Sequence, residues 1–283
     1  MSHQKINKMI AESLAIQQLS TQEADAMGYM VRSMILATMP HSKPKGNEHT
    51  RKNGDYTLSM LAPSGVGLPY GPYPRLALAY FNTYAVKNNT KEIDLGKSLS
   101  AFMKSLGLKA TGGRHGTITA MKAQIKKLAA TSVYFDYSTD QRDRGSNFNI
   151  IHNHDLWWES KNPDQESLFD SSITLGADFY EEIQKHSVPL DMRVLKLVKR
   201  SPLALDIYMW LNYKLFTMKK STVISWEDLN GFFGSDYGEV KVFKFKFKKA
   251  FEKVSLAAPE FKVFDHEKGL LLMPSKLHIA KKE

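Results

Sequence analysis

Cysteine is absent from the 283 residues of this sequence. Its absence excludes disulfide bonds, thiolate nucleophiles and zinc sites built on cysteine, and it is typical of proteins that work in a reducing cytosol. Long apolar runs are also missing, since none approaches the roughly 20 residues that a membrane-spanning helix needs. The N-terminus shows no signal-peptide core either. We therefore expect a soluble, intracellular protein with no membrane partner.

Acidic residues are missing from one part of the chain, residues 97–127. The whole chain carries a formal net charge of +10 at pH 7. The basic residues of this segment are Lys97, Lys104, Lys109, Arg114, Lys122, Lys126 and Lys127. A solvated helix face normally mixes both signs of charge, so this excess predicts a polyanionic partner. Nucleic acid is favoured over lipid, because no aromatic amphipathic anchor accompanies the charge.

The same region has the pattern of two helices joined by a glycine turn. Ser98 is a suitable N-cap for the first helix, and Gly107 is a suitable stop. After the turn, apolar residues recur at helical spacing and predict one buried stripe. That stripe consists of Ile118, Met121, Ile125 and Leu128. The pattern is typical of a helix-turn-helix, and the alternative is an ordinary helix pair with a lysine-rich surface.

A constant offset of 127 residues relates the two halves of the chain. It places Ser98 on Ser225 and Gly107 on Gly234, and it maps the apolar run 76–78 onto 203–205. Single matches occur by chance, but here the N-cap, the apolar spacing and the terminal glycine all recur at the same offset. The sequence therefore predicts a duplicated unit.

Several motifs spread over residues 28–235 carry a resemblance to a known family. They are Met39-Pro40-His41-Ser42, the runs 51–58, 62–64 and 67–76, Glu92-Ile93-Asp94-Leu95-Gly96, the run 99–102, Leu106-Gly107 and Gly113-Arg114. Together they resemble the plasmid-encoded RepA replication initiators. The resemblance implies winged-helix architecture, binding to a plasmid origin and recruitment of a host replicative helicase or its loader.

Strands and a polar loop behind the first helix pair predict a wing. We expect strands at 132–138 and 148–157, with residues 139–146 as the loop that carries Arg142 and Arg144. In the second half, residues 240–254 fit a strand by alternation and a helix by the spacing of Val240, Phe243 and Phe247. We choose the helix, because it gives the second half a recognition helix. We also expect a second wing at 261–273.

The predicted fold class is α+β, mainly helical, with two tandem winged-helix domains. Residues 1–66 form an N-terminal helical and loop extension, with helix over 1–38, a loop over 40–54 and a strand at 56–61. Residues 67–188 form the first winged-helix domain and residues 189–283 the second. The stretch 189–200 links the two, and its Arg193, Lys196, Lys199 and Arg200 add positive charge.

The predicted DNA contacts come from both helix pairs and the first wing. They are Arg114, His115, Thr117, Thr119, Lys122, Lys126, Lys127, Arg142, Arg144, Lys241, Lys244, Lys248 and Lys249. The partner is double-stranded origin DNA, and a homodimer is compatible with the sequence. The expected location is the bacterial cytoplasm, associated with a plasmid.

Catalytic signals are weak. Gly96-Lys97-Ser98 lacks the glycine that a phosphate-binding loop needs five residues earlier, where Lys91 stands. His152 and His154 have the spacing of a metal pair on one strand face, as in rolling-circle nickases. However, Asn153 separates them and no supporting carboxylate is evident. We expect no catalytic residue, no metal and no cofactor. A winged-helix transcriptional regulator and, with less support, a rolling-circle nickase are the alternatives to an initiator.

Overall fold

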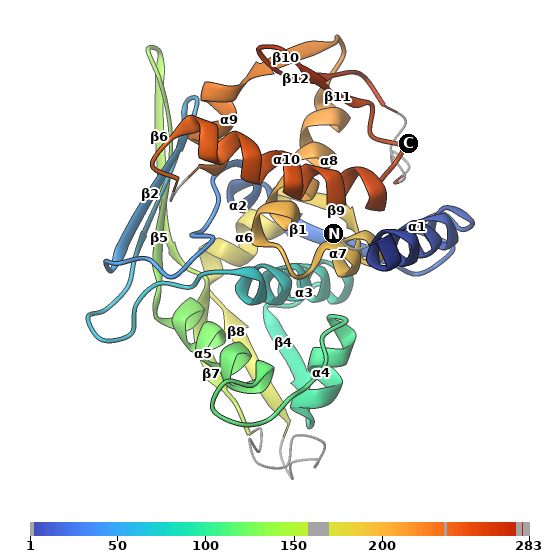
Figure 1. The fold of residues 1–283 in the computed structure, drawn as a ribbon. Helices are drawn as coiled ribbons and strands as arrows, with labels where there is room; N and C mark the ends of the chain where they lie inside the picture. The colour runs from blue at the N-terminus through green and yellow to red at the C-terminus, as the bar shows by residue number, and fades with distance from the viewer. Residues whose placement is uncertain (1–2, 158–169, 235–236, 276–278, 280–283) are drawn as a thin grey trace.

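The computed structural model describes residues 3–157, 170–234, 237–275 and 279. Helices and antiparallel strands are mixed along the chain, as expected (Figure 1). Among the described residues, no helix is both long and apolar enough to cross a bilayer. Residues 159–170, whose acidic and polar composition predicts an exposed excursion, lie almost entirely outside the described residues.

Two units of the fold share one order of elements. The first unit contains α3 (Pro72–Asn88), β4 (Glu92–Gly96), α4 (Leu99–Ser105), α5 (Thr117–Ala130), β7 (Ile151–Asp155) and β8 (Ser171–Leu175). The second contains α8 (Pro202–Thr217), β10 (Thr222–Ser225), α9 (Trp226–Phe233), α10 (Val240–Ala257), β11 (Val263–His266) and β12 (Gly269–Leu272). The sheet orders, β4-β8-β7 and β10-β12-β11, are also equivalent. The duplication predicted from the offset of 127 is therefore visible in the topology.

Local features of the first helix pair follow the sequence closely. The Ala101 N–H donates to Ser98 Oγ over 3.4 Å, which confirms the N-cap of α4. Gly107 has φ +70°, so the stop uses a backbone conformation that glycine adopts without a steric penalty. All four residues of the predicted apolar stripe of α5 are buried. In the second unit Ser225 caps α9 in the same way, with its Oγ accepting from the Asp228 N–H.

The predicted loop at 139–146 is wrong. β5 (Ser132–Thr139) and β6 (Arg142–Asn149) form a long hairpin, so Arg142 and Arg144 lie in a strand and not in a loop. This hairpin joins β2 (Glu48–Asn53) and β3 (Tyr56–Leu61) in a sheet of order β2-β3-β5-β6. The predicted strand 148–157 is divided between this sheet and the β7 strand of the first unit. β5 pairs with residues 56–61, which are far away in the chain, so this sheet depends on contacts that local pattern does not show.

The N-terminal segment and the predicted linker are also corrected. The expected helical stretch 1–38 divides into α1 (His3–Gln17), β1 (Met27–Val31) and α2 (Arg32–Leu36). β1 pairs antiparallel with β9 (Ser187–Asp191), which is followed by α7 (Met192–Val198) and preceded by α6 (Ala177–His186). The linker is thus a strand and a helix, and β9 spans the predicted domain boundary. The division into the three segments 1–66, 67–188 and 189–283 stays a prediction.

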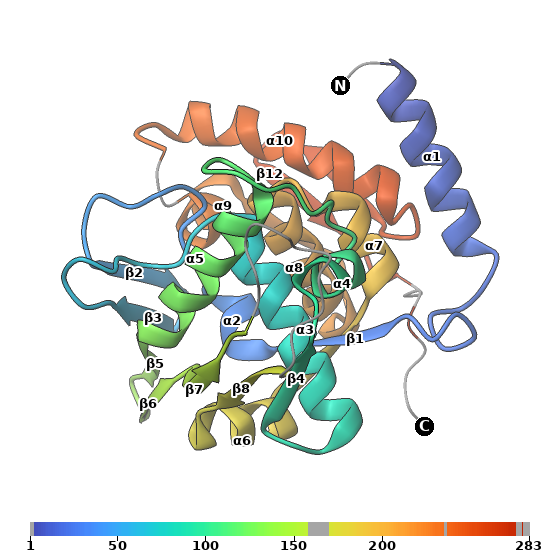
Figure 2. The same cartoon turned by 90° about the horizontal axis from the view of Figure 1, so that it is seen from below.

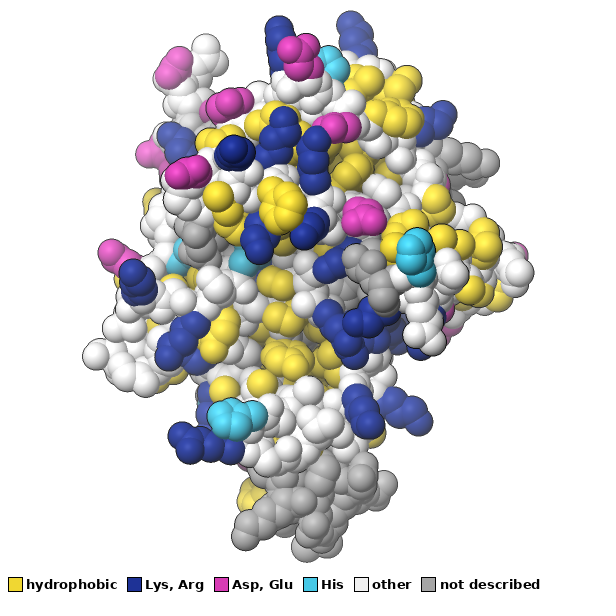
Figure 3. All heavy atoms as spheres, viewed as in Figure 1, with side chains coloured by type: hydrophobic (Ala, Val, Ile, Leu, Met, Phe, Trp, Pro, Cys, Tyr) yellow, Lys and Arg dark blue, Asp and Glu magenta, His cyan; other side chains and the backbone are white. Residues whose placement is uncertain are grey.

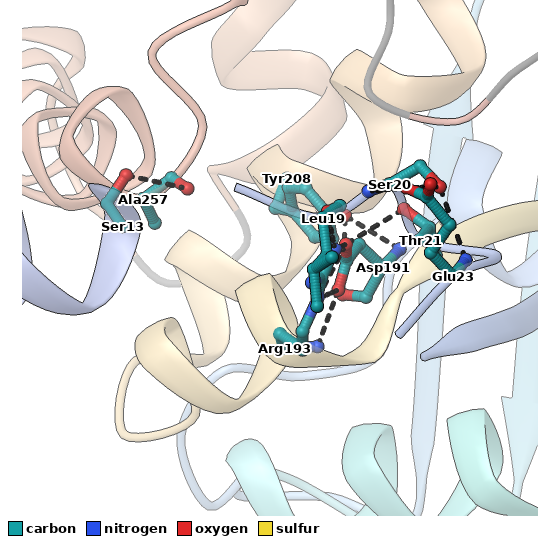
Figure 4. A network of polar contacts seen from close by, with 9 residues as sticks. All are labelled: Ser13, Leu19, Ser20, Thr21, Glu23, Asp191, Arg193, Tyr208 and Ala257. Carbon is teal, nitrogen blue, oxygen red and sulfur yellow. Dashed lines mark hydrogen bonds and ion pairs between the residues drawn. The ribbon is translucent and has the colours of Figure 1, made fainter. Parts of the chain in front are cut away.

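The half-buried Arg193 side chain is bound by a buried carboxylate (Figure 4). Asp191 accepts hydrogen bonds from Thr21 Oγ1 at 2.9 Å and from Arg193 Nη2 at 2.6 Å. Burial would raise the pKa of Asp191, but the hydrogen bonds from Arg193 and Thr21 hold it below its usual value. Arg193 also donates to the Leu19 carbonyl, so it fastens the residues after α1 to the start of α7.

The two units meet at a buried ion pair. Arg75 on α3 donates from Nε to Asp206 Oδ1 and from Nη2 to Asp206 Oδ2, both at 2.7 Å. The side chains of Arg75 and Asp206 are 1% and 2% exposed. The remaining donors of the guanidinium reach the carbonyls of Met39, Pro40 and Gly71. Because every charge is paired and bonded, the desolvation cost of burial is offset.

His41 completes this cluster. Its Nε2 lies 2.8 Å from Asp206 Oδ2. Burial lowers the pKa of His41, although the hydrogen bond to Asp206 opposes that shift. For Asp206, burial alone would raise the pKa, and the charge of Arg75 with the hydrogen bond from His41 holds it low. The loop at 39–41 is therefore tied to both units.

We expect Arg75→Met to lower the free energy of unfolding by about 3–5 kcal/mol, because it leaves the Asp206 carboxylate buried without its partner. Urea denaturation measures this loss. Lys87→Met is the matched control, since its ion pair with Asp25 is exposed and its removal should leave the midpoint nearly unchanged. Equal shifts of the two midpoints would show that the buried pair does not join the units.

The choice of a helix for residues 240–254 is confirmed, because α10 covers Val240–Ala257. Phe247 is fully buried and its ring centroid lies 5.7 Å from that of Phe233, whereas Phe245 is 54% exposed.

We expect Phe247→Ala to lower the free energy of unfolding by about 3–5 kcal/mol, and Phe245→Ala to change it little. Denaturation of both variants side by side tests this, and comparable large losses would contradict the exposed position of Phe245.

Candidate nucleic-acid interface

Threonine side chains hold the loop that leads into α5. Thr117 Oγ1 donates to the Lys109 carbonyl at 2.7 Å and accepts from the Thr111 N–H at 3.0 Å. Thr119 Oγ1 donates to the Gly113 carbonyl at 2.9 Å. Both threonines were predicted as DNA contacts, and the structure gives their hydroxyls an additional task, which is to shape residues 109–117.

Arg114 and His115 are exposed on that loop, directly before α5 begins. The two side chains therefore lie at the N-terminus of α5, where the helix dipole places partial positive charge. The outward side of α5 continues from there. Thr119, Lys122 and Lys126 line a shallow hollow together with Ala123 and Leu156. These predicted contacts are therefore brought together on one surface.

Lys127 has a different environment from its neighbours. Its Nζ donates to the Val66 carbonyl at 2.7 Å and lies 5.7 Å from the centre of the Tyr70 ring. Burial lowers the pKa of Lys127, and repulsion from Lys43 adds to the shift. Lys127 thus fastens the loop before α3 to α5, and Lys43 lines the same hollow as Lys127.

The lysines of α10 form two flanks. On one flank, Lys244 and Lys248 stand over the Trp226 ring, at 4.8 and 5.6 Å from its centre. Lys248 also forms an ion pair with Asp265 at 2.5 Å. These two predicted contacts are therefore engaged with the protein, while Lys241 is exposed.

The other flank of α10 faces the first half of the chain. Lys246, Lys249 and Lys253 line a hollow whose opposite side is formed by His41 and Ser42. Lys249 Nζ also lies 4.2 Å from the centre of the exposed Phe245 ring. Sequence reasoning named Lys249 and missed Lys246 and Lys253, although their seven-residue spacing on a helix places them on one side.

Basic side chains of α5, of α10 and of the loop before β2 line three hollows, and we call them together the basic strip. We define it as Lys122, Lys126 and Lys127 of α5, Lys43 and Lys45 of the loop before β2, and Lys246, Lys249 and Lys253 of α10. Figure 2 shows this loop on the side of the molecule where α5 and α10 lie. Among the described residues, no acidic side chain lines the three hollows of the strip. Figure 3 shows this face, where Asp and Glu side chains gather mainly in the upper half.

Lys43 and Lys45 were missed by sequence reasoning. The composition of residues 40–54 indicated only a loop, and nothing local shows that it passes between α5 and α10. The cluster of Arg75, Asp206 and His41 places the loop there, because it fixes residues 39–41 against both units.

Arg142 and Arg144 lie apart from the basic strip. Both are exposed on β6 and line a groove beside α6, with Arg32, Tyr56 and Glu182. The structure therefore does not bring these two predicted contacts to the surface formed by α5 and α10. Lys196 and Lys199 of the predicted linker instead lie against Gly107, at the end of α4.

His152 and His154 are exposed on β7. A register shift between Ile151 and Asn153 interrupts the pairing of β7 with β8 at His152, so regular alternation does not hold there. Among the described residues, no group of three or more His, Asp or Glu side chains could hold a metal ion.

The overall fold is similar to that of two solved structures. One is a selenomethionine derivative of domains 2 and 3 of RctB, with a TM-score of 0.55, 10% identity, and coverage of 87% of this chain and 97% of that chain. The other is a crystal structure of RctB domains 2-3, with a TM-score of 0.52, 11% identity, and coverage of 84% and 94%. At these identities the likeness concerns the fold alone.

The comparison with curated protein sequences found no relative. The family described as plasmid encoded RepA protein matches residues 68–228. That match spans the first unit and continues into α9 of the second, more than half of the chain. The resemblance seen in the motifs is thus confirmed, and the chain belongs to the family of plasmid-encoded RepA proteins.

Proposed function

We propose that this protein initiates plasmid replication by binding double-stranded origin DNA, and that it acts without catalysis. The observation that carries the proposal is the basic strip, whose lysines come from α5, α10 and the loop before β2, and whose hollows are lined by no acidic side chain of the described residues. Phosphates supply most of the affinity in protein–DNA binding, so a strip of lysines between two helices fits a duplex. Family membership and the fold likeness support the initiator role.

Each unit is proposed to be a winged helix. The order helix, strand, helix, helix, strand, strand recurs, and the three strands follow an equivalent sheet order in both units. In this arrangement α5 and α10 are the recognition helices, and the wings are the β7–β8 and β11–β12 hairpins. The β5–β6 hairpin is then an insertion between the first recognition helix and its wing.

Base reading and backbone contact are assigned to different residues. Arg114 is the proposed base-reading side chain, because it is exposed at the start of α5 and can offer a bidentate pair of donors to a guanine. Lysines of the basic strip meet phosphates and set the register of the protein on the duplex. The loop with Lys43 and Lys45 would hold the backbone between the two contacted grooves.

Partners and location follow the family. A host replicative helicase or its loader would be recruited to the bound origin, and a second copy of the chain would occupy a neighbouring repeat. The protein would work in the bacterial cytoplasm, where the plasmid resides. A transcriptional regulator with the same fold would use the same contacts, and footprinting separates the two, since an initiator protects several direct repeats beside an A·T-rich segment.

We expect Arg114→Ala to weaken binding to the DNA that flanks the gene by about 1–3 kcal/mol, with little effect on a scrambled duplex. The double variant Lys43→Ala with Lys45→Ala should weaken both duplexes alike and reduce the salt slope of the affinity by about 2. Fluorescence anisotropy over a range of salt concentrations measures both effects.

Lys91→Ala is the control for these variants, since Lys91 is exposed but lines none of the hollows of the strip. Its affinity and salt slope should match those of the wild type. If Arg114→Ala weakened both duplexes to the same extent, the base contact would be wrong. If the loop variant behaved like the control, the strip would not be the backbone contact.

His152→Ala combined with His154→Ala should leave DNA binding and plasmid replication nearly unchanged, because no third metal ligand supports the pair in the part of the chain that the structure describes. Supercoiled origin plasmid incubated with the wild type and Mg²⁺ or Mn²⁺ provides the direct assay. Nicking by the wild type that disappears in the double variant would contradict a non-catalytic role and favour the nickase.

A further inference from the structure

A groove outside the basic strip runs between the inserted hairpin and α6. Its two adjoining hollows share Phe135, Arg144, Ser146, Glu182 and His186, so they form one continuous depression. We call it the hairpin groove. None of its lining residues belongs to the basic strip, and the duplex contacts proposed above leave it unused.

The floor of the hairpin groove is aromatic because of strand register. Tyr56 of β3 pairs with Tyr137 of β5, and Tyr137 pairs with Arg144 of β6, so these side chains share one face of the sheet. Phe135 follows two residues along on that face. The Tyr56 ring centroid lies 4.8 Å from that of Tyr137 and 5.7 Å from that of Phe135. The three rings are half-buried and form a platform that opens into the groove.

Positive charge surrounds one end of this platform. Arg32, Arg142 and Arg144 line it, and the only acidic side chain among the described residues of this hollow is Glu182. Glu182 lies 3.9 Å from His186 and is 23% exposed. Burial raises the pKa of Glu182, and the charges of His186 and Arg32 oppose that shift. The other end of the groove carries Asp178 and Glu181 beside Lys185.

Aromatic rings beside arginines bind a phosphate-bearing aromatic group. A planar base can stack on a tyrosine or phenylalanine ring, and guanidinium groups bind its phosphate in a fork. The opposite, acidic end of the groove would repel further phosphates, so only a short stretch fits. A paired base presents no free face, and stacking on the platform therefore requires an unpaired nucleotide.

We propose that the hairpin groove binds a short segment of single-stranded DNA, with a base stacked on Tyr137 and a phosphate held by Arg142 and Arg144. The inference rests on the proposed function and deepens it, because an opened origin presents single-stranded DNA next to the bound duplex. The group that the groove would recognise is an unpaired nucleoside phosphate, and a free nucleotide contains the same group. The groove and the basic strip use different residues, so the protein can hold duplex and single strand at once.

Fluorescein-labelled oligo(dT) of about 15 nucleotides tests the proposal on the full chain, by anisotropy. Tyr137→Leu should weaken its binding about tenfold, the loss expected for one base–aromatic stack. The matched control is Tyr134→Leu, on the same strand β5 but on the opposite face of the sheet, where Tyr134 is exposed. That variant should bind oligo(dT) like the wild type.

Arg142→Gln changes an exposed side chain and keeps the assay informative if Tyr137→Leu fails to fold. It should weaken oligo(dT) binding severalfold and leave duplex affinity unchanged, whereas Arg114→Ala should do the reverse. Equal effects of Tyr134→Leu and Tyr137→Leu, or unchanged binding by Arg142→Gln, would overturn the proposal. Equal loss of duplex and oligo(dT) binding in Arg142→Gln would overturn it too.

Competition separates the two sources of the ligand. Thymidine 5′-monophosphate and ATP, added at the nucleotide concentration of the oligo(dT), should not displace it. Displacement by either would show that the groove serves a free nucleotide and would overturn the single-strand proposal. Wild-type protein that binds oligo(dT) but no flanking duplex would instead contradict the proposed initiator function, so the two failures are distinguishable.

Discussion

The buried pair of Arg75 and Asp206 is the interaction on which the arrangement of this protein depends. One guanidinium binds a carboxylate of the second unit and three carbonyls of the first half, with His41 on the other side of the carboxylate. A buried charge needs all of these partners, so the geometry of the joint has little freedom. The same contacts place the loop with Lys43 and Lys45 between α5 and α10. The same cluster of contacts therefore holds the two units together and positions the candidate DNA surface.

The two units share a topology but differ in what was added to the first. The inserted β5–β6 hairpin pairs with β3, so a strand of the N-terminal segment is part of the sheet that contains this hairpin. The added sheet carries arginines and aromatic rings that have no counterpart in the second unit. Duplicated helix pairs would serve the repeated part of the task, which is holding a duplex, and the insertion provides a surface of different chemistry.

Lysine count alone does not identify a contact surface. Lys127 is fastened to the Val66 carbonyl, and Lys248 to Asp265, so part of the positive charge of both helices stabilises the fold. Lys246 and Lys253, by contrast, line an open hollow beside Ser42. Orientation around the helix axis decides between these two uses, and it follows from which side of α10 packs on the core through Phe243 and Phe247.

The sequence by itself determined the helices of the two helix pairs, their caps and the duplication. Ser98, Gly107 and the phenylalanines of α10 act within one or two turns, where spacing and capping are local properties. Only the tertiary structure decided the strands β1 and β2, the position of Arg142 and Arg144, and the joining of Lys43 to both helix pairs. A strand is stabilised by a partner that can lie anywhere in the chain, and a surface forms from residues that only folding brings together. Local pattern does not show which partner a strand will have or which distant residues will share a surface.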